Sequence, residues 1–123
     1  MSYEVLWQGH SATVRYSARV DFGEFMDAIL NIHADPNYAA LRYVIHDMLA
    51  VAELDFSQVD MLAMVAQELG ARYTNPGVRP AVVSTDPRMQ EATRTFSQLT
   101  KLDVGFFSNM ADALHWVKAP ATP

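Results

Sequence analysis

Three polar side chains at the ends of two β-branched runs carry the clearest chemical signal in this chain. Asp47 follows residues 41–46, and Ser84 and Thr85 follow residues 80–83. An apolar helical segment separates the two runs, which predicts a right-handed β-α-β unit with parallel strands. Open α/β sheets usually bind their ligands where such strands end. We therefore expect Asp47, Ser84 and Thr85 to lie together at one sheet edge and to orient the polar part of a ligand.

Each of these residues also suits an ordinary structural role. Asp47 can accept hydrogen bonds from the backbone N–H groups of residues 49 and 50, and Ser84 and Thr85 suit a turn before a helix. As an alternative function, Asp47 would be the base of a small-molecule enzyme, which requires a second polar group about 3 Å from a substrate atom.

His46 directly precedes Asp47, so the two side chains point to opposite faces of a strand. This geometry argues against a shared metal ion and against a catalytic triad of Ser84, His46 and Asp47. We expect His46 to pack on the face of the sheet. The remaining histidines have no second ligand at metal-binding spacing, and we expect them to be on the surface or half-buried: His10, His33 and His115. The expected site therefore contains no catalytic residue, no metal ligand and no cofactor.

An unusually apolar segment follows Asp47. The expected loop 48–55 is apolar where a polar loop would be ordinary, and the helix expected over 57–73 has apolar residues on more than one face. Such breadth predicts two contacts, one with the sheet and one with another surface. Methionine adapts well to irregular partners. The apolar candidates for binding are therefore Met48, Leu49, Met61, Met64 and Val65, and ordinary core packing is their alternative role.

The other elements follow from hydrophobic periodicity and helix caps. Alternation over 13–20 and a run over 3–8, separated by a turn at 9–10, predict a hairpin. Cap residues predict helix starts at Asp21, Asp86 and Asn109, while Asp55 or Ser57 is expected to cap the second helix. A fifth strand is expected over 104–107.

The predicted fold is an α/β βα superhelix in the order β-β-α-β-α-β-α-β-α, with an N-terminal hairpin followed by parallel strands. If every crossover is right-handed, all four helices cover one face of the sheet. Arg15 and Arg19 would then lie on the bare opposite face.

Length and composition narrow the class of protein. A chain of 123 residues predicts one domain over 1–119 with a frayed tail at 120–123. A net charge of -5 with scattered basic residues argues against nucleic-acid binding. The absence of cysteine excludes disulfides and thiol catalysis. No apolar stretch is long enough to span a bilayer and no secretion signal is evident, so we expect a cytoplasmic protein.

Four short motifs together resemble a known family: His-Ala-Asp-Pro at 33–36, Leu-Arg-Tyr-Val-Ile-His-Asp at 41–47, Ala-Glu-Leu-Asp-Phe-Ser at 52–57 and Val-Val-Ser-Thr-Asp-Pro at 82–87. In order and spacing they are similar to the SpoIIAA-like, STAS-related family, in its uncharacterised bacterial branch. The resemblance covers almost the whole chain and implies a regulatory or binding role. The architecture is also similar to lipid-carrying domains of the CRAL-TRIO type, which makes an apolar ligand a candidate.

One departure from the family affects the expected function. Phosphorylatable antagonists of this family carry a hydroxyl shortly after the strand that ends in Asp, but residues 47–53 contain none. A phosphorylation switch would need Ser57 or Thr85 and ranks last. We therefore expect a non-enzymatic regulatory or binding module that acts through 48–55 and 57–73. Its partner would be another protein, a second copy or a lipid-like molecule, and peripheral contact with a membrane is a further alternative.

Overall fold

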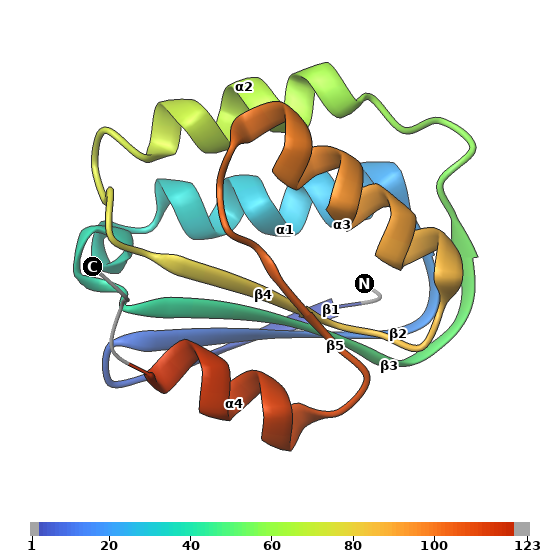
Figure 1. Cartoon of the computed structure of the whole chain (residues 1–123), viewed down its shortest axis with the longest axis horizontal. Coiled ribbons are helices and arrows are strands. Elements are labelled where there is room, and N and C mark those ends of the chain that lie inside the picture. The colour runs from blue at the N-terminus through green and yellow to red at the C-terminus, as the bar shows by residue number, and fades with distance from the viewer. Residues whose placement is uncertain (1–2, 120–123) are drawn as a thin grey trace.

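The computed structural model describes residues 3–119, which build a five-stranded sheet in the order β1-β2-β3-β4-β5 (Figure 1). The expected succession of elements and the N-terminal hairpin are confirmed, because β1 is antiparallel to β2 and every later neighbour is parallel. The strands are β1 (Tyr3–Gln8), β2 (Ser11–Asp21), β3 (Tyr43–Asp55), β4 (Arg79–Val83) and β5 (Gly105–Phe107). A short 3-10 helix, Pro36–Ala40, precedes β3.

The helices lie on both faces of the sheet, so the expectation of a single helical face is wrong. One face carries α1 (Phe22–Ala34), α2 (Met61–Ala71) and α3 (Pro87–Thr100), and α4 (Met110–Lys118) covers the other (Figure 1). The handedness rule constrains only helices that connect two parallel strands. Because α4 follows the last strand, it is free to pack on the opposite face. Arg15 and Arg19 are exposed on strand β2, and Arg19 forms ion pairs with Glu53 and Asp55 of β3.

The sheet separates two apolar cores. The larger core lies beneath α1, α2 and α3 and includes Tyr16, Phe25 and Ile32. The smaller core lies beneath α4 and consists of Ile45, Ala81, Val83, Ala113 and Val117.

Three of the expected helix caps are confirmed, and one is wrong. Asp21, Asp86 and Asn109 each accept a backbone N–H bond in the first turn of α1, α3 and α4. Asp60 caps α2, because its Oδ1 accepts from the N–H of Ala63 at 3.0 Å. The helix expected over 57–73 is therefore shorter at both ends. Asp55 and Ser57 instead bond to each other in the connection before α2.

The segment 48–55 is a strand rather than the expected loop. Strand β2 has 11 residues, whereas β1 has only six and pairs with the first half of β2 alone, so the second half of β2 depends on β3 for its strand pairing. Strand β3 supplies it by continuing to Asp55, which pairs with Asp21. The apolar composition of 48–55 is thus explained in part by strand pairing and packing. Among them, Met48 and Leu54 are buried.

Strand β2 contains an irregularity where this extension begins. Register shifts relative to β3 fall between Arg15 and Ser17 and between Ala18 and Arg19. Ala18 has a positive φ of 58°, a conformation that costs a residue with a Cβ about 1–2 kcal/mol. The expected alternation therefore fails at Ala18, which is exposed, and resumes at the buried Val20.

The predicted tail at 120–123 lies outside the described residues. Within residues 3–119, no helix has the length and apolarity needed to cross a membrane.

Candidate functional site

The β3–β4 pairing brings the first candidate residues to one sheet edge, as the β-α-β pattern predicts. Asp47 is opposite Val83, and Ser84 is the next residue. Asp47 lies within β3 rather than at its end, and its Oδ1 accepts from the backbone N–H of Leu49 at 3.1 Å. Ser84 is buried, and its Oγ accepts from the N–H of Asp86 at 3.0 Å. Both side chains thus make the local backbone bonds that were their alternative role.

The carboxyl edge has two hollows, of about 40 and about 400 Å³, and the larger one is lined by Ser84, Thr85, Asp86, Pro87, Gln90, Phe106 and Ser108. A gap of about 40 Å³ brings Met48 and Leu49 beside Ser84 and Thr85, and Asp47 does not line it. Pockets for small ligands usually measure about 300–1,000 Å³. Thr85 is exposed and next to Asp86, whose carboxylate is paired with Arg88. Ligand binding by these residues stays a prediction. The gap beside Met48 and Leu49 is too small for a ligand, whereas the hollow of about 400 Å³ beside Ser84 and Thr85 lies within the usual range, and Asp47 lines neither of them.

The methionines chosen from α2 face the protein interior. Met64 is buried, and Met61 and Val65 pack against the larger core. Other large apolar residues of α2 and of its two flanking segments are exposed, and we call them the outer stripe: Val59, Leu62, Leu69 and Tyr73, exposed by 41%, 75%, 40% and 94%.

The outer stripe follows from helical spacing. Leu62, Leu69 and Tyr73 are separated by seven and four residues, which places them on one side of a helix and its C-terminal extension. The sequence carried this signal, because the same apolar breadth predicted a second contact. The cap at Asp60, rather than at Asp55 or Ser57, identifies where the helix starts but not which side faces outward; the packing of Met64 decides that.

A buried polar cluster lies beneath α2. His33 Nε2 is 3.4 Å from Glu68 Oε2, and His33 Nδ1 is 2.9 Å from Gln67 Nε2. Burial raises the pKa of Glu68, but its hydrogen bond and charge interaction with His33, together with Arg72, make the net shift downward. The Tyr38 ring is tilted by 58° against the His33 ring at a centroid distance of 4.9 Å, and burial raises the pKa of Tyr38 to about 12. His33 was expected to be on the surface or half-buried, and a tenth of its side chain is exposed.

His46 is packed on the sheet face, as its position before Asp47 predicts. Its Nδ1 lies 2.9 Å from the hydroxyl of Tyr16, and its ring packs on Phe25. Burial lowers the pKa of His46 to about 4, so the ring is neutral at pH 7. Two narrow cavities of about 20 and 50 Å³ adjoin His46 and Glu68. Neither has room for a lipid-like molecule.

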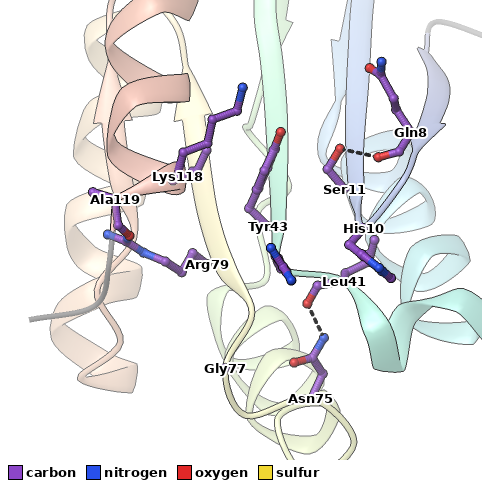
Figure 2. A pocket seen from close by; sticks show the side chains of 12 residues that line it. Gln8, His10, Ser11, Leu41, Tyr43, Asn75, Gly77, Arg79, Lys118 and Ala119 are labelled. Atoms are coloured by element: carbon purple, nitrogen blue, oxygen red, sulfur yellow. Dashed lines mark hydrogen bonds between the residues drawn. The ribbon is translucent and has the colours of Figure 1, made fainter.

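A further hollow lies at the opposite, amino edge of the sheet (Figure 2). It has a volume of about 730 Å³ and is formed by the β1–β2 turn, the starts of β3 and β4 and the end of α4. Its cationic side chains are Arg42, Arg79 and Lys118. We call this hollow the amino-edge basin. Sequence reasoning missed it because its residues come from distant segments and because parallel sheets direct attention to the carboxyl ends of strands.

Comparisons with known proteins establish the fold. No family model matches the sequence, and no curated protein matches it at a significant level. Among solved structures, the chain is similar to the unphosphorylated anti-sigma factor antagonist SpoIIAA, with a TM-score of 0.59 and 12% identity over 96% of this chain and 99% of that one. An anti-sigma factor antagonist from Mycobacterium paratuberculosis gives 0.57 and 15% over 95% and 93%.

A third similar structure is an uncharacterised protein with a SpoIIAA-like fold from Shewanella loihica PV-4. Its TM-score is 0.54 at 14% identity, over 94% of this chain and 91% of that one. The chain therefore has the SpoIIAA-like, STAS-type fold that its motifs resemble. At these identities the likeness concerns the fold.

Proposed function

We propose that this protein is a non-enzymatic regulatory module that binds another protein through the outer stripe of α2. The observation that carries the proposal is the exposure of Leu62 on α2 by 75% and of Tyr73, in the turn that follows α2, by 94%. Large apolar side chains that lie in a row on the surface mark an interaction site. An exposed helical stripe of this kind fits a groove or a second helix on a partner.

A protein partner suits the structure better than a lipid-like ligand. The cavities beneath α2 measure about 20 and 50 Å³, well below the volume that small ligands usually occupy. A protein surface needs no such cavity. Two of the structural neighbours are described as anti-sigma factor antagonists, a description that places their action on another protein. A second copy of this chain and a membrane surface remain outcomes for the experiment to separate.

The extended part of β3 offers a second contact near the start of α2. Among the described residues, β4 ends opposite Asp47, so 48–55 have no strand partner on that side. Leu49 is 45% exposed there. An unpaired strand edge can accept an extended segment of a partner. This edge keeps the predicted segment 48–55 in the proposed surface, in strand form.

The two alternative functions, an enzyme with Asp47 as its base and a phosphorylation switch, receive less support. Asp47 bonds to the Leu49 backbone and does not line the carboxyl-edge gap, so no second polar group converges on a substrate position with it. The Ser57 hydroxyl donates to Asp55, and a phosphate there would face that carboxylate, which disfavours phosphorylation as an ordering switch.

A photo-crosslinking amino acid placed at position 62 tests the proposal in cells. We expect a crosslinked protein that depends on position 62, and we expect the purified pair to bind. Leu62→Lys should abolish this binding, whereas Leu6→Lys, a matched change on β1 at the far edge of the sheet, should preserve it. A crosslink to a second copy would identify self-association. Binding that survives Leu62→Lys, or crosslinking to lipid alone, would overturn the proposal.

A further inference from the structure

We propose that the amino-edge basin binds a small anion that carries a phosphate group. The basin gathers three of the nine Lys and Arg residues of the chain, Arg42, Arg79 and Lys118, around one hollow. None of its described lining residues is acidic, although the chain as a whole has a net charge of -5. Among the described residues, these three cations form no ion pair. The local field is therefore positive in an otherwise acidic molecule.

Arg79 has a fixed position in the basin. One of its guanidinium N–H groups donates to the backbone oxygen of Ala119 at 2.6 Å, and its Cζ lies 4.0 Å from the ring centroid of Trp116. A guanidinium has five N–H donors in a rigid fork that matches phosphate geometry. The bond to Ala119 uses one donor and holds the group in place. Arg79 thus has donors left for an anion at low cost in side-chain entropy.

The rest of the basin suits a molecule larger than an inorganic ion. Its volume of about 730 Å³ lies within the range of small-ligand sites. Ser11 and Gln8 contribute uncharged polar groups on the side opposite α4, and Tyr43 lies between them and Lys118 (Figure 2). Arg42 and Lys118 provide charge at the rim, where both side chains are exposed. This combination fits a phosphate ester whose remainder rests against Tyr43.

The backbone around the basin is firmly held. The N–H of Arg42 donates to the oxygen of His10 at 2.7 Å, and the N–H of Arg79 donates to the oxygen of Arg42 at 3.0 Å. The Asn75 side chain donates to the oxygens of Tyr38 and Leu41, each at 2.8 Å. Arg42 and Arg79 therefore project from a fixed frame made of three connections that are far apart in the sequence.

Isothermal titration calorimetry of the full chain with pyrophosphate at low ionic strength tests the inference. We expect saturable binding with one site, and we expect Arg42→Gln with Lys118→Gln to weaken it at least about tenfold, since each charge-assisted hydrogen bond contributes strongly. Arg79 is left unchanged because it also holds the end of α4. The control is Arg15→Gln with Lys101→Asn, which removes equal charge elsewhere; asparagine suits the positive φ of 63° at position 101.

A second arm distinguishes the source of the phosphate. Sedimentation with phosphatidylcholine vesicles, with and without phosphatidic acid, reports binding to a lipid head group. Binding to soluble pyrophosphate alone assigns a free phosphate ester, and binding to phosphatidic acid vesicles alone assigns a lipid phosphate, provided that each is lost in the basin variant. No saturable binding in either arm, or equal loss in the basin and control variants, would overturn the inference.

Discussion

Acidification should destabilise this protein through the buried His46. In the folded state burial lowers the pKa of His46 to about 4, whereas the ordinary pKa of an exposed histidine is 6.5. Below pH 6.5 the unfolded chain binds a proton that the folded protein does not. Stability is therefore fully present above pH 6.5 and is lost as the pH falls towards 4.

The size of the effect follows from the two pKa values. Each pKa unit corresponds to about 1.4 kcal/mol, so the whole window from 6.5 to 4 corresponds to about 3 kcal/mol. About 2 kcal/mol of this should already be lost at pH 4.5, because that pH lies just above the folded-state pKa. For a domain whose total stability is about 5–15 kcal/mol, such a loss is easily measured.

Urea unfolding at several pH values between 7 and 4.5 measures this loss. We expect His46→Asn to show a loss smaller by about 2 kcal/mol than the wild type. Asparagine can still bond to Tyr16, and any packing cost lowers its stability equally at every pH. His115→Asn, which changes an exposed histidine on α4, should lose as much stability as the wild type. If His46→Asn retains the full wild-type pH dependence, burial does not hold His46 neutral and the reasoning is wrong.

Two further substitutions test the packing on each face of the sheet. Gly105→Ala should lower the free energy of unfolding by about 1–3 kcal/mol, because a Cβ there would lie 2.6 Å from the Phe107 ring and 2.8 Å from the Trp116 ring. An unchanged melting temperature would show that both rings move aside freely. The control is Gly77→Ala, because no atom lies near the Cβ position of residue 77. Met64→Asp should prevent folding or cost several kcal/mol, about 3 or more, because it buries an unpaired charge, whereas Leu62→Asp on the same helix should fold normally by circular dichroism. Equal tolerance of both changes would mean that α2 does not pack as described.

Local signals in the sequence predicted the helices and strands. The features that these signals missed depend on contacts between segments far apart in the chain. The caps at Asp21, Asp86 and Asn109 depend on bonds within one helical turn, so residue type and spacing were sufficient. The continuation of β3 to Asp55 depends on the length of β2, about 35 residues away, and no local pattern in 48–55 contains that information. The position of α4 was also missed, because no second parallel strand follows it to define a crossover.

The candidate sites show the same division. The placement of Asp47 and Ser84 at one sheet edge followed from the β-α-β pattern, but whether Asp47 was free for a ligand depended on its bond to Leu49. For α2, the breadth of its apolar surface was visible, while the choice between Met64 and Leu62 as the inward side required the packed structure. The amino-edge basin could not have been found by spacing, because Arg42, Arg79 and Lys118 meet only in the folded sheet.

The position of α4 has a consequence for synthesis on the ribosome. All five strands precede α4, and three helices can already cover one side of the sheet as it forms. Ile45, Ala81 and Val83 on the other side have no cover until residues 110–118 have emerged. A nascent chain shorter than that presents a bare apolar sheet surface, which is the kind of surface that chaperones bind and that aggregates form from. Completion of α4 therefore covers this surface and ends the period in which the nascent chain is prone to aggregate.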